Sequence, residues 1–137
     1  MNPRVKVCCI SSVAEARLAV RYGAAALGLV SAMPSGPGVI DEALIAEIAA
    51  FAPPAVATFL LTSLQDADAI VEQQRRCGTN TVQICDHLVT GSYAQMRRAM
   101  PGVKLVQVIH VTGEESIEEA RHAATEVDEF VKAAREA

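Results

Sequence analysis

Short apolar, β-branched runs alternate along the chain with Ala- and Glu-rich segments whose apolar positions recur at helical spacing. Short apolar runs bounded by turn residues are typical of buried strands, and a period of 3.6 residues is typical of helices. The pattern therefore predicts successive βα units. We expect strands at 4–10, 25–30, 56–62, 80–85 and 103–111, and helices at 12–23, 40–52, 63–78, 91–102 and 113–127.

Residues that cap or terminate helices stand near the ends of these helical segments. Ser12, Asp41 and Ser63 are the expected N-caps, because short polar side chains accept hydrogen bonds from the free N–H groups of a first turn. Pro53-Pro54 is expected to end the second helix and Gly78 the third.

The last eleven residues, 127–137, open like a sixth strand and continue as an Ala-rich, charged segment with high helix propensity. We therefore expect one α/β domain over residues 1–137, in which 128–137 form a divergent tail.

Successive βα units predict a parallel sheet covered by helices, since a crossover helix separates consecutive parallel strands. Two architectures fit this expectation. One is a partial TIM (βα)8 barrel, and the other is an open doubly wound, flavodoxin-like sheet. Length alone favours the open sheet, because a complete barrel needs about 200 residues or more.

Charge and apolar content exclude several function classes. The net charge is −4, and the longest Lys/Arg clusters are the pairs Arg75-Arg76 and Arg97-Arg98, which argues against a nucleic-acid partner. The chain shows no signal segment, and apolar runs such as 43–52 are interrupted or too short to cross a bilayer. We expect a cytoplasmic protein that does not bind membranes.

Four cysteines, Cys8, Cys9, Cys77 and Cys85, are expected to be free thiols in a reducing compartment. No pair has the spacing of a zinc ribbon or of a redox C-x-x-C motif. Cys8, Cys85 and His110 could in principle supply three metal ligands at one end of the sheet, but no local motif supports such a site. We predict neither a metal nor a cofactor.

The stretch "VKVCCISSVAEARLAVRYGAAALGLV" (5–30) resembles the opening of the phosphoribosylanthranilate isomerase family. Members begin with a Lys-x-Cys-Gly-Ile-Thr strand end, a short helix ending in Gly-Ala, and a second strand of the type Ala-x-Gly-hydrophobic-Val. Pro53-Pro54, "NTVQIC" (80–85) and "PGVKLVQVIHV" (101–111) extend the resemblance to about residue 130.

The resemblance implies a (βα)8 barrel and an Amadori rearrangement in tryptophan biosynthesis, in which a ribosylamine ring opens and a proton leaves the sugar C2 to give the ketose. In the family the strand-one Cys is the general base, and an Asp at the end of strand six is the general acid. The resemblance therefore places the base at Cys8. The alternative is that Cys8 is a packing residue, which is common for buried cysteines.

Strand geometry adds candidate residues beside Cys8. Alternate side chains share a strand face, so Lys6 should lie on the face of Cys8, and Cys9 should point to the helix layer as a small buried residue. Gln83 and Cys85 could reach the same interior, and His110 ends the fifth strand at the edge where barrel sites are built. We expect Lys6, Gln83, Cys85 and His110 to bind substrate. The alternatives are that Gln83 is a polar residue satisfied within its strand, and that His110 is a solvated loop-edge side chain without a partner, which its sequence neighbours favour.

Besides Cys9, which stands where the family pattern has a Gly, the sequence departs from that pattern at three places. No Asp follows "VDEF" (127–130), the strands that hold the substrate phosphate in such barrels do not follow, and Gly38 stands where similar sequences carry an Arg for the anthranilate carboxylate. We therefore do not expect turnover by this chain alone. The exposed sheet edges should be covered in a homodimer or by a complementing barrel fragment.

Three function classes stay open from the sequence. The first is an isomerase-like protein that takes a small phosphorylated sugar-amine. The second is a non-catalytic α/β module for assembly or ligand binding, derived from such a barrel. The third, a thiol- or metal-based redox protein, rests on the cysteines alone.

Overall fold

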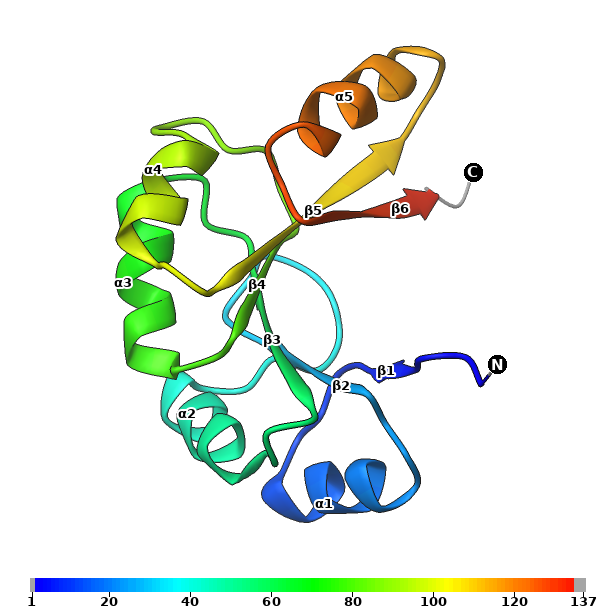
Figure 1. The fold of residues 1–137 in the computed structure, drawn as a ribbon, viewed down its shortest axis with the longest axis vertical. Coiled ribbons are helices and arrows are strands. Elements are labelled where there is room, and N and C mark those ends of the chain that lie inside the picture. The colour runs from blue at the N-terminus through cyan, green and yellow to red at the C-terminus, as the bar shows by residue number, and fades with distance from the viewer. Residues whose placement is uncertain (1, 135–137) are drawn as a thin grey trace.

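Residues 2–134 are described by a computed structural model, in which six strands alternate with five helices (Figure 1). The strands are β1 (Lys6–Val7), β2 (Ala26–Val30), β3 (Ala57–Thr62), β4 (Thr81–Ile84), β5 (Lys104–Val111) and β6 (Glu129–Ala134). The helices are α1 (Val13–Arg21), α2 (Glu42–Phe51), α3 (Ala67–Cys77), α4 (Tyr93–Ala99) and α5 (Glu115–Ala124).

The six strands form one parallel sheet in the order β1-β2-β3-β4-β5-β6. The sheet curls, its helices follow one another along the outer side, and β1 and β6 lie on the open side (Figure 1). This is the arrangement of a partial (βα)8 barrel, which confirms that expectation. The open doubly wound alternative is wrong, because that fold reverses its strand order and covers both faces of the sheet with helices.

Strand register separates the side chains into an outer and an inner set. The outer set points at the helices and forms the core with helical residues such as Ile45, Ile48, Ile70 and Met96. Its sheet members are Leu27, Leu29, Leu60, Val82, Ile84, Leu105 and Ile109. Both faces of the central strands are largely buried, which is why these strands read as almost continuous apolar runs.

Two of the expected N-caps and both expected helix ends are confirmed, since α2 ends at Phe51 just before Pro53-Pro54. The Ser12 hydroxyl accepts from the Glu15 N–H at 3.1 Å, and the Asp41 carboxylate accepts from the Leu44 N–H at 2.8 Å. Gly78 closes α3 with φ of 68°, a left-handed conformation in which a Cβ would be unfavourable.

The predicted start of the third helix is wrong. Its N-cap is Asp66, whose carboxylate accepts from the Ala69 N–H at 2.9 Å, while Ser63 lies three residues earlier and donates to the Ala32 carbonyl at 3.4 Å. Residues 63–66 are held as a loop because Asp66 pairs with Thr90 in an isolated parallel bridge. The fourth and fifth helices are also shorter than predicted at both ends.

The first strand is shorter than the predicted 4–10, and its pairing with β2 extends only over Lys6 and Val7. Two residues later Cys9 has φ of 59°. This left-handed conformation is costly for a residue with a Cβ, and it turns the chain out of the sheet before α1 begins.

The predicted opening of a sixth strand is confirmed, and the strand continues to Ala134 where a helix-prone tail was predicted. Residues 129–134 pair in parallel with β5 from Val106 to Val111. The ladder of β5 offers main-chain partners along this whole segment, and tertiary pairing of this kind outweighs an intrinsic preference for helix. The last three residues of the predicted tail lie outside the described part of the chain.

Truncating a core side chain of β3 should be costly. Leu60 is fully buried in the core between sheet and helices, so Leu60→Ala should lower the free energy of unfolding by about 2–5 kcal/mol. Leu18→Ala on α1 is the matched control, since Leu18 is 54% exposed and should change stability by far less. Urea unfolding of both variants checks this, and equal losses would contradict the assigned core.

The strained backbone at Cys9 gives a second stability prediction. Cys9→Gly should be about 1 kcal/mol more stable than Cys9→Ala, because glycine adopts the left-handed conformation without a Cβ penalty. Comparing these two variants cancels the loss of the thiol. An alanine variant as stable as the glycine variant would show that residue 9 is not left-handed in solution.

Candidate active site on the inner face of the sheet

A hydrogen bond between β1 and β4 organises the inner face. The ammonium nitrogen of Lys6 donates to Oε1 of Gln83 at 2.5 Å, and it lies 4.7 Å from the centre of the Phe59 ring on β3. Gln83 is buried, so this contact satisfies a side-chain carbonyl that would otherwise be unpaired. The structure thus brings together two of the predicted binding residues that are 77 positions apart in the chain.

Cys85 follows Gln83 on the same inner side, just after β4 ends. Its Sγ lies 3.7 Å from the Gln83 carbonyl oxygen, to which the thiol donates. Burial raises the pKa of the Cys85 thiol, and the hydrogen bond with the Gln83 side chain and the nearby Lys6 ammonium oppose that shift only in part. Cys85 is therefore a neutral thiol, and it is better suited to donating a hydrogen bond than to attacking as a nucleophile.

Cys8 lies at the carboxyl end of β1 and is exposed. It packs over Gly28 of β2 so closely that a Cβ at position 28 would lie 2.8 Å from the Cys8 Sγ and 3.0 Å from its Cα. A glycine at this position lets β1 approach β2 with the thiol on the inner face. The expectation that Cys8 shares a face with Lys6 agrees with this placement.

Cys9 does not point to the helix layer as predicted. It is half-buried against the loop before α2, where its thiol donates to the Pro37 carbonyl at 3.6 Å. Strand alternation fails here because the left-handed backbone of Cys9 has already left the strand. Burial, with the neighbouring Cys8 thiol as a smaller cause, raises the pKa of Cys9.

Cys9 also explains why position 38 is a glycine. A Cβ on Gly38 would lie 2.5 Å from the Cys9 Cβ, and Gly38 itself has φ of 83°. An arginine at position 38 therefore has no room while Cys9 occupies this space. Two of the differences from the family pattern, the Cys at 9 and the Gly at 38, are thus coupled by direct contact.

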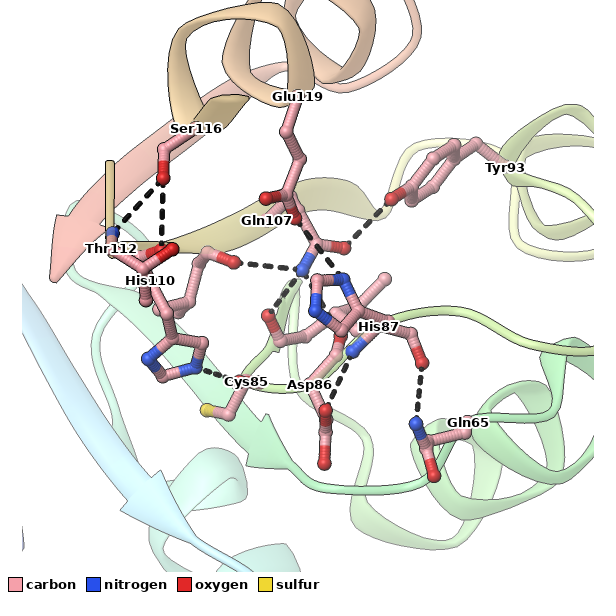
Figure 2. Close-up of polar contacts among 12 residues, drawn as sticks. Gln65, Cys85, Asp86, His87, Tyr93, Gln107, His110, Thr112, Ser116 and Glu119 are labelled. Atoms are coloured by element: carbon pink, nitrogen blue, oxygen red, sulfur yellow. Dashed lines mark hydrogen bonds and ion pairs between the residues drawn. The ribbon is translucent and has the colours of Figure 1, made fainter. Parts of the chain in front are cut away.

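His110 near the end of β5 is held by the neighbouring strand. Its Nε2 lies 2.8 Å from the Cys85 carbonyl oxygen, and Figure 2 shows the ring beside the Cys85 thiol. On α5, the Ser116 hydroxyl accepts from the Thr112 N–H at 3.0 Å and donates to the His110 carbonyl at 3.4 Å. The alternative of a solvated histidine without a partner is wrong, because the partner is a main-chain carbonyl that the sequence pattern does not reveal.

Gln107 is a residue of this region that the sequence reasoning did not single out. It is 2% exposed, lies on the outer face of β5, and accepts from the Tyr93 hydroxyl at 2.8 Å (Figure 2). Its amide nitrogen lies 3.2 Å from the Ile84 carbonyl and 3.1 Å from that of Asp86. Gln107 thus holds the main chain at the start of the loop after β4. In the sequence, its only sign is a single Gln within an otherwise apolar strand.

The loop after β4 is fixed from its other side as well. The amide of Gln65 donates to the His87 carbonyl at 3.1 Å, and the Gln65 carbonyl accepts from the N–H groups of Val89 and Thr90. The His87 ring also pairs with Glu119 of α5 at 3.1 Å (Figure 2). The loop after β4, next to Cys85, is therefore held in place by contacts within the chain itself.

A cavity of about 550 Å³ lies at the amino ends of the strands, on the side of the inner face away from Cys8. Arg4, Lys6, Phe59 and Asn80 are among its lining residues. Lys6 thus contacts both this cavity and Gln83, and it joins the two ends of the inner face.

Within residues 2–134 no group of three or more His, Cys, Asp or Glu side chains is arranged to hold a metal ion, and Cys8, Cys85 and His110 form no such group. Among the helices described, none combines the length and apolar character needed to cross a membrane.

Comparison with known proteins points to one family. No protein-family model matches the chain. Four curated relatives named N-(5'-phosphoribosyl)anthranilate isomerase match it with 31–35% identity. Isomerase 2 of Methanosarcina mazei is 31% identical over 129 residues, which cover 93% of this chain and 57% of that protein. The chain spans about half the length of the curated relatives it matches.

Solved structures of the same name share the fold. A phosphoribosyl anthranilate isomerase in complex with reduced 1-(o-carboxyphenylamino)-1-deoxyribulose 5-phosphate superimposes with a TM-score of 0.80 at 20% identity, covering 98% of this chain and 66% of that one. The monomeric form generated from the dimeric Thermotoga maritima enzyme gives 0.76 at 20% identity, covering 97% and 63%. By sequence and by fold, the chain is thus a relative of the phosphoribosylanthranilate isomerases.

Proposed function

We propose that this chain carries the base-bearing part of an aldose–ketose isomerase site, which acts on N-(5'-phosphoribosyl)anthranilate or a similar phosphorylated ribosylamine in tryptophan biosynthesis. Cys8 is the general base of this proposal. The observation that supports it best is the placement of an exposed thiol at the carboxyl end of β1, on the face that carries Lys6 and Gln83.

The chemistry needs a base beside the sugar C2 and a rigid wall opposite it. General base catalysis requires the accepting atom to lie within hydrogen-bond reach of the proton that it removes, and the close packing of Cys8 on Gly28 fixes where the thiol lies. The loop after β4 supplies the fixed wall. Lys6 adds a positive charge on the same face, which favours an anionic phosphosugar over a neutral one.

The proposal includes a partner that covers the sheet edges. Within residues 2–134, β1 and β6 each pair with a strand on one side only, and the inner face is open between them. An open edge of this kind is a template for further strands. A second copy of the chain, or a fragment that supplies the remaining βα units, would close the site.

The thiols should differ sharply in reactivity. Cys8 is exposed, whereas Cys77 is 1% exposed and burial raises its pKa to about 11, so at pH 8 Cys77 carries little thiolate. Iodoacetamide followed by mass spectrometry should therefore modify Cys8 first and Cys77 last. All four thiols should react alike in urea, and native Cys77 reacting as fast as Cys8 would contradict this placement.

Turnover is tested together with assembly state. The purified chain is assayed alone and together with a fragment of the Methanosarcina mazei relative that supplies the remaining βα units. Turnover is followed as the loss of substrate fluorescence, and light scattering after size exclusion gives the mass of each species. We expect turnover only in the species with covered edges, and Cys8→Ser should reduce it about 10²–10⁴-fold.

The matched control for that assay is Cys77→Ala, which removes a thiol from α3 without touching the inner face and should retain turnover. Equal rates for wild type and Cys8→Ser would exclude Cys8 as the base. A monomer that binds the sugar phosphate but is inert in every mixture would instead favour the alternative, a non-catalytic ligand-binding module.

A further inference from the structure

His110 holds one fixed nitrogen and one available nitrogen on the inner face. A carbonyl oxygen only accepts hydrogen bonds, so the 2.8 Å contact with the Cys85 carbonyl requires a hydrogen on Nε2. The neutral ring then carries its lone pair on Nδ1, which points away from that carbonyl (Figure 2). No hydrogen bond to Nδ1 comes from the side chains that the structure describes, so this nitrogen is the one that can exchange a proton.

Strand register places His110 on the inner side of β5. Val106 pairs with Gln83, so Val106, Val108 and His110 alternate along the inner side of β5. On β6, Ala133 is the register partner of His110. Asp86, the nearest carboxylate on the loop after β4, is exposed, and its Oδ1 accepts from the His87 N–H at 2.9 Å.

His110 is held at both its ring and its backbone, which suits a group that must keep its position during a reaction. The β4 carbonyl holds the ring, and the first turn of α5 holds the backbone through Ser116. Thr112 adds a bond from its hydroxyl to the Glu115 carboxylate at 2.9 Å. Preorganised donors of this kind are more effective in catalysis than donors that must reorient.

From these observations we propose that His110 is the general acid of the isomerase site, acting from Nδ1 opposite the Cys8 base. The assignment rests on the proposed function and adds a second catalytic residue to it. No sequence motif identifies this role, because it depends on a ring tautomer set by the neighbouring strand.

The proton transfers balance without any further reactant. Protonated His110 gives its Nδ1 proton to the ring oxygen as the C1–O bond breaks, and the amine lone pair forms the C1=N bond. The Cys8 thiolate takes the C2 proton, the C–H electrons form C1=C2, and the C=N electron pair returns to nitrogen. C1 then takes the proton back from the Cys8 thiol while the O2 proton passes to Nδ1. Both side chains return to their starting states and the sugar has become a ketose.

The direct test is NMR of the imidazoles in 15N-labelled full chain, with the reduced carboxyphenylamino-deoxyribulose 5-phosphate as probe. At a pH high enough to keep the imidazole neutral, the free chain should show His110 as the Nε2–H tautomer, and the probe should shift Nδ1 while His122 on the exposed side of α5 stays unchanged. Probe binding with an unshifted Nδ1, or an Nδ1–H tautomer in the free chain, would overturn the assignment and leave the proposed function standing.

Kinetics in the catalytically active assembly separates a catalytic from a structural role. His110→Gln should lower kcat about 10²–10⁴-fold with little change in KM, and added imidazole should restore part of the activity of His110→Ala. The controls His122→Gln and Asp86→Asn should remain active. Loss in Asp86→Asn with retention in His110→Gln would identify Asp86 as the acid instead. If wild type neither binds the probe nor turns over, the proposed function fails and this assignment fails with it.

Discussion

The curl of the sheet is the constraint on which the site depends. β1 and β4 are separated by two strands, which in a flat sheet would place them about 14 Å apart at the usual strand spacing. Lys6 nevertheless donates to Gln83 at 2.5 Å. Only a strongly curved sheet permits this contact, and the same curvature turns Cys8 and His110 toward a common interior.

The two faces of the curled sheet are covered differently. The helices cover only the outer, convex face, which holds the main core, and the smaller set of side chains lies on the concave inner face. Two glycines allow close contacts near the carboxyl end of β1. Gly28 lets the Cys8 thiol lie on β2, and Gly38 makes room for Cys9. Position 38 can therefore carry a larger side chain only if position 9 becomes smaller, which couples the loop before α2 to a residue at the end of β1.

Local chemistry made much of the fold predictable. The βα repeat, the caps at Ser12 and Asp41 and the stop at Gly78 depend on neighbouring residues, and the structure confirms each of them. The predictions that failed depend on contacts between distant segments. Asp66 caps α3 where Ser63 was expected because Thr90 pairs with it, and residues 131–134 join β5 although their propensity favours a helix.

In the candidate site, too, local features were predictable from the sequence and contacts between distant segments were not. Period-two alternation correctly put Lys6 with Gln83, but it failed for Cys9, whose backbone is left-handed, and it gave no partner for His110. The partner is a carbonyl 25 residues away, which has no side-chain signature. Gln107 was missed because its function is to hold the main chain of the loop after β4, and a single polar residue in an apolar run does not say which carbonyls it will meet.

The measurement that tests this account most directly is a 13C-edited NOE experiment on the intact chain with labelled lysine, glutamine and phenylalanine. A curled sheet predicts cross-peaks from the Lys6 ε-methylene protons to the Gln83 γ protons, and an upfield shift of those ε protons by the Phe59 ring. A Lys6 side chain at random-coil shifts with no contact to β4 would mean that the sheet is open, and it would contradict a shared site for Cys8 and His110.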